Sequence, residues 1–337
     1  MARGAAFTPA EALSLFESNS PLLRHNPYAL GVPANTLRAL QSDWRVFVRF
    51  CEHNGYPSLP ANAAIVTGFV EHSFGDGVRR SVATVERYLS TISRAHTLSN
   101  LPDPTRAVQV KGAFRHLRRG RPAKQPRCAL RWTHISYALE HLDSGNVAWD
   151  LRAKALLAVS YSTMARRSEL VALAMHDLKF NPESDDGVAI IRMTKVDREE
   201  PRYLAPEATA SLKAWLSHSG ITEGPVFLRF ENTGVVGKRA IQSQEVARII
   251  QRVARLLNAV SPGHNVWPLQ HLAAHSTRIG AAHDMAANGI DLTSIMHSGG
   301  WTDPKMPRYY TRELAARESG MARMMRALKE KAASGAA

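Results

Sequence analysis

The chain has 337 residues, with 43 Lys and Arg against 29 Asp and Glu and a formal net charge of +14. Its 45% hydrophobic and 21% charged residues are typical of a folded globular protein of about two domains, which excludes wholesale disorder. The sequence has no run of about 18 apolar residues, no apolar stretch like that of a secretory signal and only two cysteines, so we expect no membrane span and a reducing compartment.

The positive charge predicts a polyanionic partner, and nucleic acid fits better than an anionic membrane surface. The charge gathers in the first part of the chain, where residues 1–127 hold 17 basic and 8 acidic residues. Within it, the segment 115–127 (RHLRRGRPAKQPR) has six Lys and Arg, no acid, one Gly and two Pro. This composition predicts a basic helix that ends in an extended linker between two domains.

Before that linker the sequence predicts helices only. Four prolines punctuate residues 1–33, which we expect to form a poorly structured arm. Beyond the arm, apolar residues recur at spacings of three and four, the period of a helix with one buried face. The helices are expected over residues 35–53, 61–72, 80–96 and 105–119.

The helix expected over residues 80–96 carries two separate stripes. Its apolar stripe consists of Val82, Val85, Leu89 and Ile92. Its second stripe consists of Arg80, Thr84, Arg87, Thr91 and Arg94. A row of this kind fits a DNA groove or its phosphate walls, and it fits an ordinary solvated helix face equally well.

After the linker the pattern mixes helices and strands. Residues 187–194 (GVAIIRMT) and 201–205 (PRYLA) predict two short strands, which the polar residues 195–200 join into a hairpin. Helices are expected over residues 133–141, 150–160, 168–173, 206–218, 243–257, 269–288, 291–298 and 315–331. The last of them carries Met321, Met324, Met325 and Leu328, a stripe that fits either core packing or docking on a neighbouring subunit.

Common catalytic motifs are missing. His271 and His275 lie four residues apart, but Leu272 stands where a zinc protease of that spacing has its glutamate, and the chain has no Cys-x-x-Cys pair. The segment 234–239 (GVVGKR) lacks the spacing of a phosphate-binding loop, and the chain has no Gly-x-Ser-x-Gly. Nothing in the sequence therefore predicts a metal or another cofactor.

A dispersed set of polar and aromatic residues remains: Arg166, Lys195, His275, Arg278, Trp301 and Tyr310. Each of them alone could be a surface ion-pair partner or a core residue. Together, their order along the chain resembles the catalytic domain of the tyrosine recombinase (phage integrase) family. Residues 275–314 (HSTRIGAAHDMAANGIDLTSIMHSGGWTDPKMPRYYTREL) are similar in detail to the Cre-like branch, which also has Trp where most relatives have His.

The resemblance implies a mainly α fold with a small β-sheet: an all-helical N-terminal core-binding domain that clamps DNA, followed by a mixed α/β catalytic domain. The expected boundaries are an arm at 1–33, the core-binding domain at 34–119, a basic linker at 120–129, the catalytic domain at 130–314 and a C-terminal docking helix and tail at 315–337.

The resemblance also implies the role of each site residue. Tyr310 is the nucleophile that forms a 3′-phosphotyrosine, with Tyr309 as the alternative if the register differs by one. Arg166 and Arg278 bind the non-bridging phosphate oxygens, and Lys195 protonates the leaving 5′-oxygen. His275 takes part in proton transfer at the phenol, Trp301 donates its indole N–H to the phosphate, and Glu169 supports the network.

Candidate DNA contacts follow from position and charge. Gln242, Ser243, Gln244 and Arg248 open the helix that matches the family's base-contacting helix, and Gln can pair with adenine in the major groove. Phosphate or groove contacts are expected from Arg80, Arg87, Arg94, Arg118, Arg119 and Arg121.

The sequence thus predicts a site-specific DNA recombinase that needs neither metal nor ATP. Its expected partner is double-stranded DNA with inverted-repeat half-sites, bound by a homotetramer in a bacterial cytoplasm near the nucleoid, of plasmid or phage origin. The enzymatic alternatives are a type IB topoisomerase or a telomere resolvase. The alternative from another class is a non-catalytic DNA-binding protein.

Overall fold

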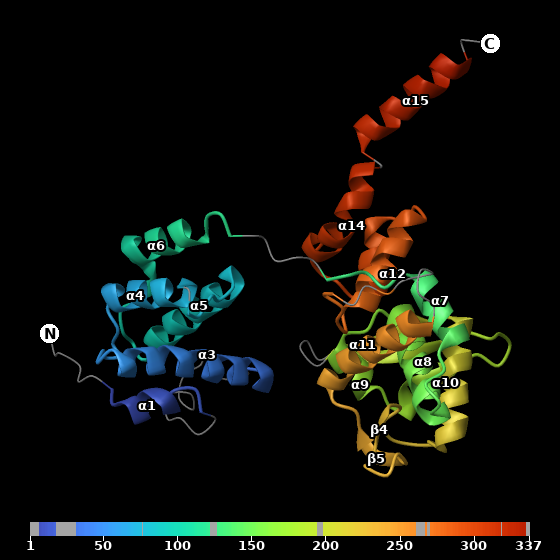
Figure 1. The fold of residues 1–337 in the computed structure, drawn as a ribbon, viewed down its shortest axis with the longest axis horizontal. Helices are drawn as coiled ribbons and strands as arrows, with labels where there is room; N and C mark the ends of the chain where they lie inside the picture. The colour runs from blue at the N-terminus through green and yellow to red at the C-terminus, as the bar shows by residue number, and fades with distance from the viewer. Residues whose placement is uncertain are drawn as a thin grey trace. The chain divides into compact units, whose positions relative to one another are not determined.

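The computed structural model describes residues 7–17, 32–75, 77–121, 127–193, 198–260, 267, 270–317 and 319–334. The chain divides into two compact units, an N-terminal unit of Met1–Gln125 and a C-terminal unit of Pro126–Ala337 (Figure 1). Helices dominate both, and the strands belong to two small sheets in the C-terminal unit, so the predicted fold class is confirmed. Among the described residues, no helix combines the length and apolar character needed to cross a membrane.

The N-terminal unit is built from helices around one apolar core. They are α1 (Pro9–Ser14), α3 (Ala34–His53), α4 (Ala63–Phe74), α5 (Val82–Leu98), the short 3₁₀ helix η1 (Pro104–Arg106) and α6 (Val108–Arg118). Side chains cap several of their starts: Asn62 accepts from the amide of Ile65 in α4, and Ser81 accepts from that of Thr84 in α5. The buried core includes Trp44, Phe47, Val66, Phe69 and Val85.

Residues 7–17 differ from the poorly structured arm expected there. Thr8 and Glu11 form a capping box that begins α1, and Ala12, Leu15 and Phe16 are fully buried against the core. The indole of Trp44 donates to the carbonyl of Ala12 at 2.5 Å. Because this short helix buries its apolar face, the prolines after it do not prevent it from forming.

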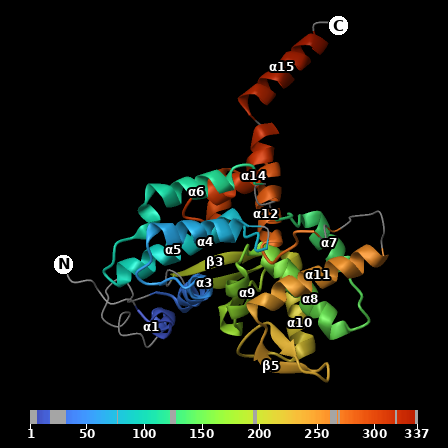
Figure 2. The same ribbon diagram turned by 60° about the vertical axis from the view of Figure 1, so that its left-hand side comes forward.

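The C-terminal unit encloses a second core around α8 (Val147–Ser162), which packs against helices on several sides (Figure 2). The other helices are α7 (Trp132–His141), α9 (Arg167–Ala172), the 3₁₀ helix η2 (Met175–Asp177), α10 (Pro206–Ser219), α11 (Ser243–Val260), α12 (Ser276–Ala287), α13 (Leu292–Gly299), α14 (Lys305–Arg317) and α15 (Gly320–Ser334). On α15 the apolar side chains Met321, Met324, Met325 and Leu328 are exposed.

The predicted hairpin is present as β2 (Gly187–Met193) and β3 (Arg198–Leu204), which pair antiparallel from Gly187 opposite Leu204 to Met193 opposite Arg198. A third strand, β1 (Leu178–Phe180), extends this sheet, and β4 (Leu228–Phe230) and β5 (Val236–Ala240) form a separate pair. The sequence did not predict these three strands. It also did not predict α14, and it joined the end of α14 to α15 as one helix.

The helix expected over residues 269–288 is shorter than predicted, since α12 begins at Ser276. The chain that enters the C-terminal unit runs along it, because the amide of Leu130 donates to the carbonyl of Ser276 at 2.9 Å. A Cβ at position 280 would overlap the Leu130 carbonyl, so this approach requires Gly280. The contact fixes the helix that carries Arg278.

Candidate active site

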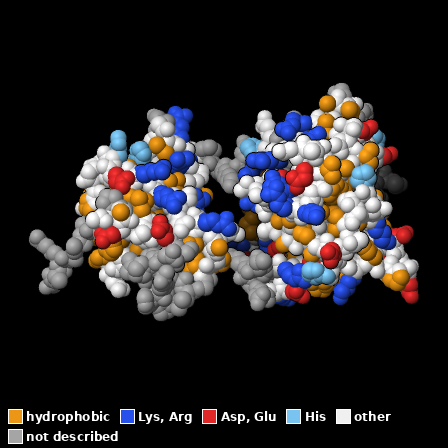
Figure 3. Space-filling model, turned by 90° about the horizontal axis from the view of Figure 1, so that it is seen from below, with side chains coloured by type: hydrophobic (Ala, Val, Ile, Leu, Met, Phe, Trp, Pro, Cys, Tyr) orange, Lys and Arg blue, Asp and Glu red, His pale blue; other side chains and the backbone are white. Residues whose placement is uncertain are grey.

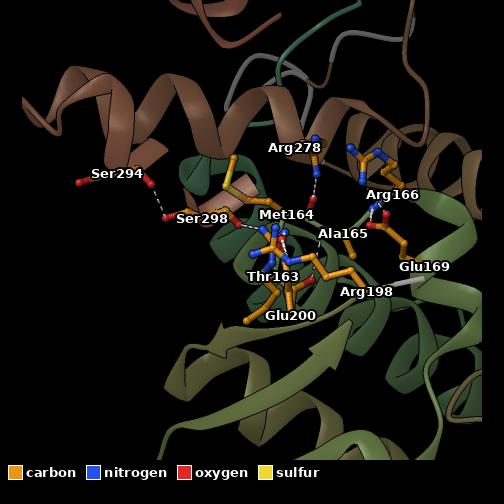
Figure 4. A network of polar contacts seen from close by, with 11 residues as sticks. Thr163, Met164, Ala165, Arg166, Glu169, Arg198, Glu200, Arg278, Ser294 and Ser298 are labelled. Atoms are coloured by element: carbon orange, nitrogen blue, oxygen red, sulfur yellow. Dashed lines mark hydrogen bonds and ion pairs between the residues drawn. The ribbon is translucent and has the colours of Figure 1, made fainter. Parts of the chain in front are cut away.

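Arg166 and Glu169 are fixed to each other where α9 begins. The Glu169 carboxylate accepts from the Arg166 amide at 2.8 Å and from its guanidinium Nη1 at 2.6 Å (Figure 4). Glu169 is buried, whereas the Arg166 side chain is 39% exposed. One carboxylate thus holds both the backbone and the guanidinium of Arg166.

Arg278 lies on α12 and is only 1% exposed. Its Nη1 donates to the carbonyl of Met164, in the turn between α8 and α9, but Nε and Nη2 have no hydrogen-bond partner among the described residues. Its guanidinium carbon lies 3.9 Å from the centroid of the Trp301 ring. Burial, followed by repulsion from Arg166, lowers the pKa of Arg278 to about 9. Unpaired donors on a buried cation are typical of a site that receives an anion.

His275 directly precedes α12, one turn before Arg278. Burial is the main cause that lowers the pKa of His275 to about 4, and the positive charges of Arg278 and Arg166 lower it further. The imidazole is therefore neutral near pH 7. A neutral ring can accept a proton, which a protonated ring cannot.

Tyr310 lies on α14 beside these cations. Its ring centroid is 6.2 Å from that of Trp301. Burial raises the pKa of Tyr310, while Arg278 and Arg166 act in the opposite direction because they favour the phenolate. Tyr309 is instead 38% exposed, with the guanidinium carbon of Arg312 4.4 Å from its ring centroid. Of the two adjacent tyrosines, Tyr310 is the one that interacts electrostatically with the buried Arg278 and the half-buried Arg166.

Arg202, on β3, belongs to the same cluster and was missed by the sequence analysis. Its side chain is 6% exposed, and it interacts electrostatically with Arg166, Glu169 and Arg278. Its guanidinium donates to the carbonyl of Ser298 and to the carboxylate of Glu200. Nothing in the segment PRYLA distinguishes this arginine from a strand residue facing solvent.

Lys195 lies outside the described residues. The strands on either side of it are described: β2 ends at Met193 and β3 begins at Arg198. The structure thus brings together Arg166, Glu169, His275, Arg278, Trp301 and Tyr310, which come from four different segments of the C-terminal unit.

The candidate DNA contacts fall into two groups. Arg80, Arg118 and Arg119 are exposed in the N-terminal unit, and Gln242, Gln244 and Arg248 are exposed in the C-terminal unit, with Ser243 half-buried at the start of α11. Arg87 and Arg121 have partners in their own unit: Arg87 pairs with Asp43, and Arg121 donates to the carbonyl of Phe74. Figure 3 shows groups of Lys and Arg side chains on the drawn face of both units.

The stripe predicted over residues 80–96 needs correction. Helix α5 begins at Val82 with Ser81 as its cap, so Arg80 precedes it. Thr91 is 1% exposed, and Arg94 is half-buried. These residues do not form one continuous solvent-facing row, because α5 packs against its neighbours over more of its circumference than the apolar stripe indicates.

The profile of the phage integrase family matches residues 133–317. Among curated proteins, the recombinase cre of Escherichia phage P1 is 25% identical over 307 residues, which are 86% of this chain and 88% of that protein. An integrase/recombinase xerD homolog of Selenomonas ruminantium is 27% identical over 291 residues, which are 82% of this chain and 81% of that protein.

Two solved structures have a similar fold. The Tn1549 transposon integrase in complex with a circular intermediate DNA has a TM-score of 0.61 at 14% identity, over 89% of this chain and 94% of that chain. The XerH site-specific recombinase bound to palindromic difH substrate has a TM-score of 0.57 at 14% identity, over 86% of this chain and 81% of that chain. The family profile spans more than half of the sequence, and the chain therefore belongs to the phage integrase family of tyrosine recombinases, the enzymes of site-specific DNA recombination.

Proposed function

We propose that the chain cuts and rejoins DNA through a 3′-phosphotyrosine at Tyr310, as a tetramer on two target sites with inverted-repeat half-sites. The observation that carries the proposal is the position of Tyr310: its phenol interacts with Arg278 and Arg166, and Arg278 is a buried cation with unused donors. A bound phosphodiester would satisfy those donors and lie beside the phenolic oxygen.

In the proposed step, the phenolic oxygen of Tyr310 attacks phosphorus, and the bond from phosphorus to the 5′-oxygen breaks. The phenolic proton passes to the neutral imidazole of His275, and the leaving 5′-oxygen takes a proton from Lys195. Arg166 and Arg278 bind the non-bridging oxygens, and the indole N–H of Trp301 donates to the phosphate. Glu169 keeps Arg166 in place through its two hydrogen bonds.

The negative charge of the transition state explains why the proposed site contains two arginines, Arg166 and Arg278. The transition state carries negative charge on the phosphoryl oxygens, and fixed cations shielded from water stabilise it without reorganising. One phosphoester replaces another, so the bond energy is retained for rejoining. We therefore propose that the reaction needs neither metal nor ATP.

DNA binding by both units follows from their charge. Arg80, Arg94, Arg118 and Arg119 of the N-terminal domain and the basic linker would contact phosphates, while Gln242, Gln244 and Arg248 at the start of α11 would contact bases. Such a clamp releases counterions, so its affinity should fall steeply with salt. We place the protein in a bacterial cytoplasm with the nucleoid, consistent with its charge and its phage relative.

Assembly into the tetramer is assigned to α15. Its exposed Met321, Met324, Met325 and Leu328 would pack on a neighbouring subunit. Deleting residues 319–337 removes α15 and leaves α14, with Tyr310, intact. The truncated chain should bind a single half-site as the full chain does but fail to join two sites, as measured by native gel electrophoresis. Normal pairing of two sites would remove α15 from the assembly.

A nicked suicide duplex tests the chemistry. After cleavage, the short fragment that carries the free 5′-hydroxyl dissociates, so rejoining is prevented and the covalent adduct accumulates. Tyr310→Phe should form no adduct, whereas Tyr309→Phe, the matched control, should form it. Loss of the adduct in Tyr309→Phe alone would move the nucleophile by one residue. Relaxation of plasmids without a specific site would indicate a topoisomerase, and binding without any adduct would indicate a non-catalytic protein.

Lys195 has its own test. Lys195→Ala should slow cleavage strongly and leave DNA affinity unchanged, because a general acid acts on the leaving group after binding. Cleavage as fast as that of the parent chain would exclude Lys195 from the reaction.

A further inference from the structure

The guanidinium of Arg202 joins two elements that are far apart in sequence. Arg202 lies on β3, and one of its amino groups donates to the carbonyl of Ser298 in the last turn of α13. The other donates to the carboxylate of Glu200 on its own strand, and Glu200 also pairs with Arg198 at 3.4 Å (Figure 4). The side chain of Arg202 is 6% exposed and that of Glu200 16%, so the contact between these two groups forms largely away from water.

The turn after α13 is packed between this pair and the indole of Trp301. Gly300 has φ of +60°, and a Cβ there would overlap the guanidinium of Arg202 and lie 2.8 Å from Glu200 Oε2. A Cβ at Gly299 would overlap the Trp301 ring. The amide of Trp301 donates to the carbonyl of Met296 at 2.9 Å, which ties the indole to α13. The backbone at Gly299 and Gly300 is therefore confined by the Trp301 ring on one side and by Arg202 and Glu200 on the other.

Trp301 in turn contacts the proposed phosphate site. Its ring lies 3.9 Å from the guanidinium carbon of Arg278, whose Nη1 is held by the carbonyl of Met164. A continuous series of contacts thus runs from Arg202 through Ser298 and the glycine turn to Trp301 and Arg278. The series joins β3 to α12 within the C-terminal unit.

A buried ion pair is a weak source of stability, because the cost of desolvating both charges offsets most of their attraction. The pair of Arg202 and Glu200 also leaves Nε of Arg202 without a hydrogen-bond partner in the described residues. An apolar pair would fill the same space with no such cost. Arg202 supplies what an apolar side chain cannot: two directed hydrogen bonds that set where α13 ends relative to β3.

We infer that Arg202 is a positioning residue of the cleavage reaction, which holds the glycine turn so that Trp301 and Arg278 meet the scissile phosphate. We assign it no contact with DNA, because its side chain is 6% exposed and both of its amino groups are occupied within the protein. This inference rests on the proposed function and adds a residue to it that neither charge nor motif indicated.

Arg202→Lys tests this role, because lysine keeps the charge but cannot bridge the Ser298 carbonyl and the Glu200 carboxylate in the same geometry. Arg192→Lys is the matched control: Arg192 lies on the adjacent strand β2, and its ion pairs with Asp177 and Glu199 stay outside the series. Arg202→Lys should cleave the suicide duplex about 10- to 100-fold more slowly than the parent chain, the size of loss caused by a small misplacement at a reacting centre. Arg192→Lys should cleave at the parent rate.

A second substrate separates positioning from general damage. A methylphosphonate at the scissile position lacks the negative charge that Arg278 neutralises, so its cleavage depends less on the placement of that guanidinium. Arg202→Lys should therefore be slowed much less on the methylphosphonate than on the phosphodiester. Equal losses on both substrates, or no loss on either, would overturn the inference.

Thermal melting shows whether Arg202→Lys folds. If it does not, Glu200→Gln takes its place: it keeps Arg202 and an uncharged acceptor, and it should show the same substrate-dependent loss on a smaller scale. Equal rates of Glu200→Gln and the parent chain on both substrates would then count against the inference. The parent chain is the reference for the proposed function itself, which fails if the parent forms no adduct, whatever the variants do.

Discussion

The two units treat their buried charges differently. In the N-terminal unit, Asp43 is 3% exposed and accepts two hydrogen bonds from Arg87, at 2.6 and 2.8 Å. His96 is fully buried, and both of its ring nitrogens have partners, the amide of Ala61 at 2.9 Å and the carbonyl of Ile92 at 2.8 Å. In the C-terminal unit, Arg278 is as deeply buried but leaves two of its nitrogens without partners among the described residues.

Under the proposed function, Asp43 and His96 complete the fold of their unit, whereas Arg278 keeps donors for a bound phosphate. A buried polar group without a partner costs free energy, so a protein keeps one where function gives it a reason. Asp43 and His96 are satisfied by their own unit. Arg278 is instead repelled by the positive charges of Arg166 and Arg202. A bound phosphate would reduce the free-energy cost of this repulsion.

The largest expected effect comes from Arg278→Met. This variant tests whether Arg278, unlike Asp43 and His96, serves the reaction and not the stability of its unit. We expect cleavage of the suicide duplex to slow by about 100- to 1,000-fold, the usual loss of one fixed donor at a developing negative charge. We expect the stability of the C-terminal unit to change little, because removing a desolvated cation with two unpaired nitrogens offsets the loss of its hydrogen bond to the Met164 carbonyl. Single-turnover cleavage and hydrogen exchange of α12 amides measure the two quantities.

Arg152→Met is the matched control, since Arg152 is also buried but lies outside the site. Its Nη1 donates to the carbonyl of Leu228 at 2.7 Å, and its guanidinium carbon is 4.1 Å from the Phe230 ring centroid. This variant should lose stability and keep its cleavage rate. A similar loss of stability in Arg278→Met would place Arg278 among the structural arginines.

The next effect concerns pH. An unfolded histidine takes up a proton near pH 6.5, whereas the pKa of His275 in the folded chain is about 4. Between these values the unfolded chain binds the proton and the folded chain does not, so stability is full above pH 6.5 and falls as the pH drops toward 4. His275→Gln should reduce that fall by up to about 3 kcal/mol.

Hydrogen exchange of α12 amides at several pH values measures this fall in the full chain. A short duplex should reduce it as well, because a phosphate beside His275 favours the protonated imidazole and raises its pKa. An unchanged pH dependence in His275→Gln would show that burial does not keep this ring neutral.

The smallest effect is expected in the N-terminal unit. Asp43→Ala removes both hydrogen bonds to Arg87, whose side chain is 57% exposed and remains solvated. The unit should lose about 1–2 kcal/mol of stability, the range for charged hydrogen bonds at a partly exposed site. Exchange of α3 and α5 amides measures the loss. With saturating enzyme, the cleavage rate should not change, and a drop comparable to that of Arg278→Met would contradict the distinction between the units.

Local sequence patterns were sufficient to predict secondary structure where the spacing of apolar residues alone decides it. The hairpin of β2 and β3 followed from two β-rich runs around a polar turn, and α3 followed from apolar residues at helical spacing. The predictions were weaker where packing decides. Helix α14 was missed because its only buried residues are Pro307 and Thr311, which form no apolar stripe. Thr91 was placed on an exposed face because its burial depends on neighbouring helices.

By itself, the sequence determined the family and the fold class, because the segment from His275 to Leu314 matches the motif of the family and apolar spacing indicates mostly helices. It also supplied the candidate site residues on which the proposed function rests. Only the tertiary structure decided which side chains pair and which stay unpaired. Asp43 meets Arg87 across 44 residues, and Arg202 meets Ser298 across 96. Such contacts follow from the packing of distant elements, and no local spacing encodes them.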